Sequence, residues 1–314
     1  IRVQQQKPDQ AEKLFHQAIK CDSRIVGPHV NLARLYATDR PFDAISELNQ
    51  ALKLTPDNPQ GASLLRTIAK ESALSATRSG NKERALAILM QAREALPPDP
   101  ELLYDLGLVA LESNLYQDAQ RLLQQALVAR PEYYDAIYAL ARAYLGENMA
   151  NQAEEQIRKY LNARPDDSTA QYGLGYILMA EQRLEEAQRA FEKSLALQPD
   201  QTESLFQLGE IAMQQGNNDA ARENYLKVVS HDPHHAGALT ELGIIAYRAS
   251  QYSEARTDLE RAVGSAPSYQ KAHYYYALTL TRLGEKTNAD REFEISKSLQ
   301  KSHVTNSHLA LKQP

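Results

Sequence analysis

The sequence contains few of the residues on which several classes of protein depend. Cys21 is the single cysteine, so an intrachain disulfide is impossible and cysteine pairing says nothing about the redox compartment. With 13 glycines and 14 prolines in 314 residues, low-complexity disorder is excluded, and we expect the whole length to fold. No stretch of 18 consecutive apolar residues occurs, so the sequence predicts a water-soluble chain without direct membrane insertion.

An excess of positive charge is missing as well. Thirty-five Lys and Arg against 40 Asp and Glu give a formal net charge of −5 and a pI near 6.0. Binding to phosphate backbones requires a basic footprint, so we do not expect nucleic acid as a partner. The chain begins at Ile1, not at Met, and its start lacks a signal-peptide pattern. We therefore expect a piece of a longer protein, and its compartment stays open.

Common catalytic motifs are also absent. There is no G-x-S-x-G, P-loop, G-x-G-x-x-G or H-E-x-x-H, and Cys21 lies in no known nucleophile motif. His231, His234 and His235 form the cluster HDPHH, which is similar to a set of imidazole ligands. These histidines fall at a turn, and no carboxylate or Cys ligand stands beside them at helical spacing. We therefore expect an incidental polar turn, with adventitious metal binding as the alternative. We expect no enzyme activity, no catalytic residue, no cofactor and no metal.

The most prominent feature of the sequence is a repeat of 34 residues, which we call the repeat period. Proline recurs at this spacing at Pro97, Pro131, Pro165, Pro199, Pro233 and Pro267. Alanine recurs in the same way at Ala119, Ala153, Ala187, Ala221, Ala255 and Ala289. A large residue followed by a small one recurs at Leu106-Gly107, Leu140-Ala141, Leu174-Gly175, Leu208-Gly209, Leu242-Gly243 and Tyr276-Ala277. Four places after each alanine stands a bulky residue, which is helical spacing: Leu123, Ile157, Phe191, Tyr225, Leu259 and Phe293.

The pattern within each repeat therefore predicts two antiparallel helices of about 12–14 residues, separated by a polar break such as Gln214–Asn217. The recurrent proline ends the second helix, and the recurrent small residues allow the two helices to approach closely. In this pattern the sequence resembles the tetratricopeptide repeat family. The resemblance implies an all-α fold, a right-handed superhelical solenoid of antiparallel helix pairs over residues 1–303. We place a half repeat at 1–23, repeats at about 24–58, 59–99, 100–133, 134–167, 168–201, 202–235, 236–269 and 270–303, and a tail at 304–314.

One unit departs from the period. The interval from Pro56 to Pro97 is 41 residues, and we assign the seven extra residues, about two helical turns, to the first helix between Pro59 and Arg78. Seven residues nearly preserve the packing face of a helix. The insertion is either tolerated without consequence or forms a wall or docking spur. Both solenoid ends lack polar caps, so we expect more repeats, another domain or a second copy to cover them.

The resemblance implies that the first helix of each repeat lines the inner surface of the solenoid. The candidate binding residues on it are Tyr104, Leu108, Leu111, Tyr138, Arg142, Leu145, Tyr172, Tyr176, Met179, Phe206, Glu210, Met213, Ile244, Tyr247 and Tyr274. Tyr, Phe, Leu and Met suit a peptide or an amphipathic helix because they offer a large, adaptable contact area. The alternative is that the tyrosine rings pack against neighbouring helices.

Three functional hypotheses follow. The first is a protein-interaction scaffold that binds a peptide or helical segment along residues 100–282. The second is the recognition or regulatory part of a larger assembly, for example one of polysaccharide secretion or glycosyl transfer. The third is a platform that self-assembles through the solenoid ends into a homo-oligomer.

Overall fold

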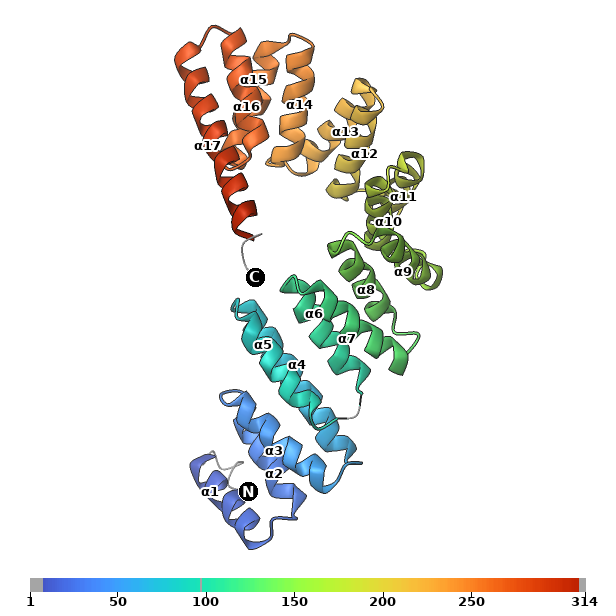
Figure 1. The fold of residues 1–314 in the computed structure, drawn as a ribbon, viewed down its shortest axis with the longest axis vertical. Helices are drawn as coiled ribbons and strands as arrows, with labels where there is room; N and C mark the ends of the chain where they lie inside the picture. The colour runs from blue at the N-terminus through green and yellow to red at the C-terminus, as the bar shows by residue number, and fades with distance from the viewer. Residues whose placement is uncertain (1–7, 97, 311–314) are drawn as a thin grey trace. The chain divides into compact units, whose positions relative to one another are not determined.

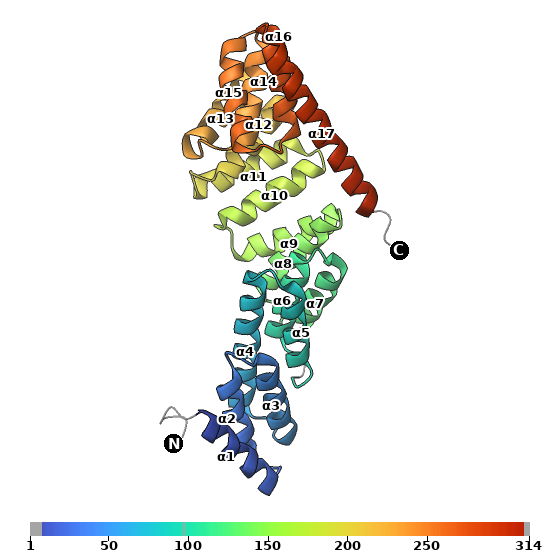
Figure 2. The same ribbon diagram turned by 90° about the vertical axis from the view of Figure 1, so that its left-hand side faces the viewer.

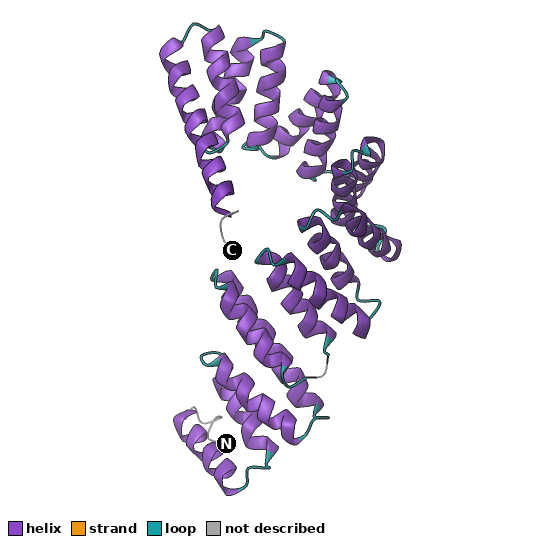
Figure 3. Ribbon diagram, viewed as in Figure 1, coloured by secondary structure: helices purple, strands orange, loops and turns teal. Residues whose placement is uncertain are grey.

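The computed structural model describes residues 8–96 and 98–310, with side chains up to Lys301. Residues 1–7, Pro97 and 311–314 lie outside it, including one of the six spaced prolines. Within the described ranges the chain forms seventeen α-helices and no strand (Figure 3). None of these helices combines the length and the apolar character needed to cross a membrane. The fold is an all-α solenoid, as the sequence predicts.

The chain divides into two compact units, Ile1–Pro165 and Asp166–Pro314. The helices of the first unit are α1 (Pro8–Cys21), α2 (Val26–Tyr36), α3 (Pro41–Leu54), α4 (Pro59–Arg78), α5 (Lys82–Arg93), α6 (Pro100–Glu112), α7 (Tyr116–Ala129), α8 (Tyr134–Gly146) and α9 (Ala150–Ala163). Those of the second unit are α10 (Ser168–Ala180), α11 (Leu184–Leu197), α12 (Thr202–Gln214), α13 (Asn218–His231), α14 (Ala236–Arg248), α15 (Tyr252–Ser265), α16 (Gln270–Arg282) and α17 (Lys286–Ala310). Within each unit, consecutive helices pack as antiparallel pairs (Figures 1 and 2).

The helix pairs follow the repeat in the sequence. Six first helices have equal length and begin one repeat period apart, at the positions where the repeats are predicted to start. They are α6, α8, α10, α12, α14 and α16. The lengthened first helix is α4, with 20 residues. Because α4 and α6 end one repeat period apart, the extra residues of α4 are its first ones, Pro59–Leu65.

The recurrent small residue lets each pair close. Tyr225 of α13 is fully buried, and its ring lies over Gly209 of α12. A Cβ atom at Gly209 would lie 2.4 Å from a ring carbon of Tyr225. Gly175 faces the buried Phe191 in the same way, with 2.7 Å for the equivalent distance. A side chain on the second helix thus fills the space that glycine leaves on the first, which explains the fixed spacing of the two patterns.

The turn inside seven of the pairs, from α4 and α5 to α16 and α17, contains a residue with positive φ, which recurs with the repeat period. Glycine occupies this position at Gly80, Gly216 and Gly284, and other residues occupy it at Asn114, Asn148, Gln182 and Ser250. In these turns the left-handed residue ends the first helix and lets the chain reverse within a few residues. Glycine accepts this conformation without strain, and asparagine is the next most tolerant residue.

The last helix, α17, continues to Ala310, into the segment 304–314 that is expected to be a tail. Residues 300–310 contain neither glycine nor proline, so no residue there forces a helix to stop. The remainder of that tail, residues 311–314, lies outside the described part of the chain.

Candidate functional site

The candidate site is the face of the first helices made by their second, fifth, sixth, ninth and twelfth residues, which we call the groove face. These positions recur at intervals of three and four, so they share one side of a helix. The first helices of a unit contact each other in the pairs α4 and α6, α6 and α8, α10 and α12, and α14 and α16. Residues one repeat period apart in those pairs therefore lie on adjacent helices.

The fifth position carries the aromatic row. Tyr104, Tyr138, Tyr172 and Phe206 are partly buried, and Tyr274 is 43% exposed. Each ring packs against another aromatic ring of its own unit: Tyr104 on Tyr133 at 5.0 Å between centroids, Tyr138 on Tyr160 at 5.2 Å, Tyr172 on Phe191 at 5.7 Å, Phe206 on Tyr225 at 5.6 Å and Tyr274 on Phe293 at 6.1 Å. The rings are thus held by structural packing and still expose part of their surface.

Two of the expected groove residues belong to the core. Leu111 is only 6% exposed and is part of the core cluster of the first unit. Ile244 is 1% exposed, and Thr240 one turn before it is fully buried, because α16 packs over this part of α14. Their assignment to a binding surface is wrong.

The other expected positions retain exposed surface. Tyr176 is 41% exposed and Arg142 is exposed, so both offer contact area directly. Six further side chains are partly exposed: Leu108, Leu145, Met179, Glu210, Met213 and Tyr247.

The groove residues predicted from the sequence do not include the sixth position of the first helices. It holds Asp105 in α6, Gln207 in α12, Glu241 in α14 and Tyr275 in α16. These residues share the helix face of the second and ninth positions, so their spacing alone predicts a place on the groove face. They make this face more polar than the aromatic row suggests.

A buried charge lies at the sixth position of the second unit. Glu241 is 5% exposed, and the ammonium of Lys271 donates a hydrogen bond to its Oε1. Burial raises the pKa of Glu241, which the hydrogen bond and charge of Lys271 oppose. Burial also works against the charge of Lys271, yet its bond to Glu241 leaves the pKa of the lysine raised. The pair joins α14 to α16 on the groove face.

In the first unit, arginines pair with the acids at the second position. Arg130 contacts Glu101 at 3.2 Å and Arg164 contacts Asp135 at 2.8 Å. Both arginines precede one of the spaced prolines, and the guanidinium of Arg130 also lies over the ring of Tyr133, at 4.7 Å. These acids are therefore neutralised within the chain and offer little net charge to a partner.

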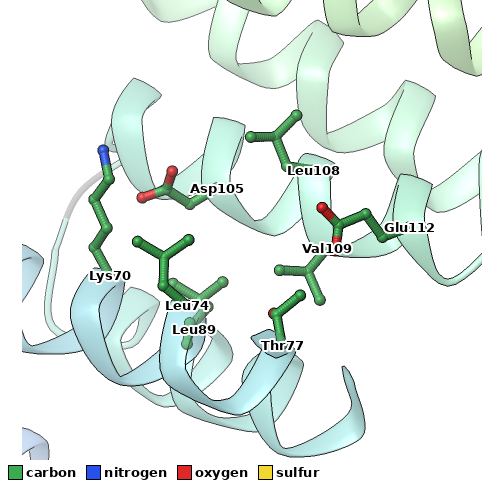
Figure 4. A pocket seen from close by; sticks show the side chains of 9 residues that line it. Lys70, Leu74, Thr77, Leu89, Asp105, Leu108, Val109 and Glu112 are labelled. Carbon is green, nitrogen blue, oxygen red and sulfur yellow. The ribbon is translucent and has the colours of Figure 1, made fainter. Parts of the chain in front are cut away.

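One pocket opens on the groove face, between α4 and α6 (Figure 4). It has a cavity volume of about 60 Å³. Its lining residues are Lys70, Ala73, Leu74, Thr77, Leu89, Asp105, Leu108, Val109 and Glu112. Burial raises the pKa of Asp105 to about 6, against the opposing charge of Lys70 and with support from the charges of Glu101 and Asp99.

The histidine cluster has a structural task. His235 accepts a hydrogen bond from the backbone N–H of Ala238 through Nδ1, at 3.0 Å, and so caps α14. Its ring also packs on Phe206 at 5.0 Å. In the described part of the chain no three His, Cys, Asp or Glu side chains are placed to hold a metal ion.

Comparisons with known proteins point to one kind of repeat. The model described as "Cytochrome c-type biogenesis protein H TPR domain" matches residues 123–258. The model described as "Tetratricopeptide repeat" matches residues 70–134 and 240–290, so the two together span 70–290. No curated protein sequence matches the chain.

Solved structures share the fold at low sequence identity. MamA from Desulfovibrio magneticus RS-1 is 24% identical with a TM-score of 0.51, over 55% of this chain and 97% of that one. PilF from Pseudomonas aeruginosa is 19% identical with a TM-score of 0.59, over 68% and 97% of the two chains. A tetratricopeptide repeat protein from Parabacteroides merdae is 18% identical with a TM-score of 0.56, over 81% and 98%. At these identities the likeness concerns the fold alone.

Proposed function

Because the chain belongs to the tetratricopeptide repeat family, we propose that it is a protein-binding scaffold that holds a segment of a partner against its groove face. The observation that carries this proposal is a row of aromatic rings, each packed on one side and open on another. Rings fixed in this way lose little conformational freedom when a partner covers them, which favours affinity. Proteins built of such repeats generally act as scaffolds and not as enzymes, which agrees with the lack of catalytic motifs.

Each unit supplies its own contact surface. In the first unit the surface consists of Tyr104, Leu108, Tyr138, Arg142 and Leu145. In the second unit it consists of Tyr172, Tyr176, Met179, Phe206, Glu210, Met213, Tyr247 and Tyr274. Methionine and tyrosine adapt to irregular shapes, so a peptide or a helix with apolar side chains on one face suits both surfaces.

A second candidate function is that of a recognition part within a larger assembly. It is favoured by the match of residues 123–258 to a repeat domain of a cytochrome c-type biogenesis protein. In this case the groove face would bind another component of the machinery. Fusion of the complete gene product to an affinity tag, followed by purification of an intact complex, distinguishes it from a free scaffold.

The proposal is tested by selecting binders from a displayed library of random 12-residue peptides on the whole chain. Tyr176→Ser and Tyr274→Ser remove the two most exposed tyrosine rings among the described residues of the second unit. Leu226→Ser is the matched control, because Leu226 is equally exposed, at 44%, on the second helix α13. We expect the peptides that bind the second unit to lose at least about tenfold in affinity with the tyrosine variants and to keep it with the control. Binding unaffected by the tyrosine variants, or recovery of no peptide at all, would contradict the proposal.

A further inference from the structure

We propose that the pocket between α4 and α6 selects a partner segment in which a branched aliphatic side chain is followed or preceded, within one helical turn, by Lys or Arg. This inference rests on the proposed function and names the chemistry that one part of the groove face recognises. It follows from the shape of the pocket, from its apolar floor and from the charge at its mouth.

The pocket lies on the groove face, although the extra residues of the longer repeat obscure this in the sequence. Lys70, Leu74 and Thr77 of α4 lie one repeat period before Tyr104, Leu108 and Leu111, so they are the fifth, ninth and twelfth residues of the repeat helix. Where most first helices carry an aromatic ring, α4 carries the flexible Lys70. No ring therefore fills the space between α4 and α6, and the pocket stays open.

The floor of the pocket is apolar and already packed. Leu89 and Val109 are buried there, while Leu74 and Leu108 border the opening with part of their surface exposed (Figure 4). The buried Ala73 also lines the pocket. A cavity volume of about 60 Å³ holds several water molecules, of which few would find polar partners on this floor. Replacing them with the end of a leucine or isoleucine side chain is favourable because it removes apolar surface from water on both sides.

The mouth of the pocket has a surplus of negative charge. The carboxylates of Asp105 and Glu112 border it from α6, and only the ammonium of Lys70 faces them from α4 (Figure 4). In the described residues no basic group lies within 4.0 Å of the Asp105 carboxylate. A cation brought by a partner would therefore meet a carboxylate without an ion pair inside a partly dry site, where charge pairs are stronger than in water.

The nearby charges are already engaged. Asp99, at the start of α6, pairs with Arg66 of α4 at 2.5 Å. Glu101 pairs with Arg130 at 3.2 Å. These pairs leave Asp105 and Glu112 as the acids on α6 that line the pocket, opposite Lys70 of α4. Lys82 of α5 also lies near the mouth, where its ammonium donates a hydrogen bond to the backbone carbonyl of Glu112.

Selectivity for a cation should depend on pH through Asp105. Burial raises its pKa to about 6, so the carboxyl is ionised at neutral pH and becomes protonated as the pH falls below that value. The charges that act on it are Lys70 of α4, which opposes the rise, and Glu101 and Asp99 at the start of α6, which support it. Lysine and arginine keep their charge throughout this range. Binding of a basic segment should therefore weaken between pH 7 and pH 5.

The experiment uses a displayed library of 12-residue peptides with leucine fixed at the centre and all other positions random, selected on the whole chain. We expect Lys and Arg to be enriched at least about threefold over the input within four residues of that leucine. Asp105→Asn keeps the shape of the side chain and removes its charge, and Glu112→Gln does the same at the other side of the mouth. The control is Asp118→Asn, which changes an exposed acid on the second helix α7.

Two results support the inference together: enrichment of basic residues on the unaltered chain, and at least a tenfold loss of affinity of the selected peptides with Asp105→Asn but not with Asp118→Asn. Peptides that bind with no basic preference, or that ignore both pocket variants, overturn this inference while leaving the proposed function in place. Failure to recover any peptide overturns both. Circular dichroism of each variant checks that the helices are unchanged.

Discussion

The hydroxyl of Tyr225 donates a hydrogen bond of 2.6 Å to Oε1 of Glu210, so a fully buried residue of the second helix α13 holds a carboxylate on the groove face. Burial and this bond both raise the pKa of Tyr225, which therefore stays a neutral donor. The same ring covers Gly209 and packs on Phe206 at 5.6 Å. One side chain thus links closure of the helix pair to the position of two groove residues.

Gly209→Ala should destabilise the chain, because its Cβ would collide with a ring that has no room to move. The distance of 2.4 Å is far below van der Waals contact, and the hydrogen bond to Glu210 also holds the ring. We expect the free energy of unfolding to fall by about 1–3 kcal/mol. Gly264→Ala in α15 is the opposite case, since nothing lies within 4 Å of its Cβ position, and it should raise the free energy of unfolding by up to about 1 kcal/mol. Urea denaturation followed by circular dichroism measures both.

Tyr225→Phe removes the hydroxyl and keeps the ring, so it isolates the hydrogen bond to Glu210. A hydrogen bond to a carboxylate contributes about 1.5–3 kcal/mol, and the partial exposure of Glu210 favours the lower end. We expect the free energy of unfolding to fall by about 1.5 kcal/mol. Tyr252→Phe is the control, because its hydroxyl makes only a 3.4 Å contact with Ser250 at the surface. Equal losses in the two variants would show that the Glu210 bond contributes nothing particular.

Most of the fold could be predicted from the spacing of a few residue types in the sequence. The recurrent proline, alanine and large-small pair are direct consequences of helix-pair closure, as Gly209 and Tyr225 illustrate. The lengthened period before Pro97 hid the groove residues of α4, because Lys70 and Leu74 no longer follow the aromatic pattern. When a repeat lacks its signature residue, its first helix can be aligned with the others only by the residue at which the helix ends, here Arg78.

The accessibility of each candidate residue depends on contacts that the periodicity does not encode. The same ninth position is exposed as Tyr176 and buried as Ile244, since α16 packs closely over α14. The sixth position was equally visible in the spacing, yet Glu241 and Asp105 are buried by different neighbours to different degrees. Helix phase was thus predictable, whereas the distance between adjacent repeats was not.

Lys271→Met should destabilise the second unit by leaving Glu241 buried without its partner. Methionine keeps the apolar stem, so the change removes mainly the charge. Because Lys271 is partly exposed, we expect a loss of about 1–2 kcal/mol at pH 7. Burial already raises the pKa of Glu241, and loss of Lys271 raises it further, so the deficit should shrink as the pH falls and Glu241 takes up a proton. The double variant Lys271→Met with Glu241→Gln should recover most of the loss in urea denaturation at pH 7, and failure to do so would contradict this account.

Asp105→Asn should change how stability depends on pH. The pKa of Asp105 is raised in the folded chain to about 6, above the ordinary value of 3.8 that we expect when the chain is unfolded. Protonated Asp105 therefore favours the folded state, and this contribution is complete below about pH 4 and disappears as the pH rises through about 6. The difference corresponds to an upper limit of about 3 kcal/mol, reduced by the partial exposure of the carboxyl. We expect Asp105→Asn to flatten the fall in the free energy of unfolding between pH 4 and pH 6.5 relative to the unaltered chain, measured by urea denaturation at each pH. Asp118→Asn, which alters an exposed acid, should leave that pH dependence intact, and an identical profile for Asp105→Asn would mean that Asp105 titrates like an exposed aspartate.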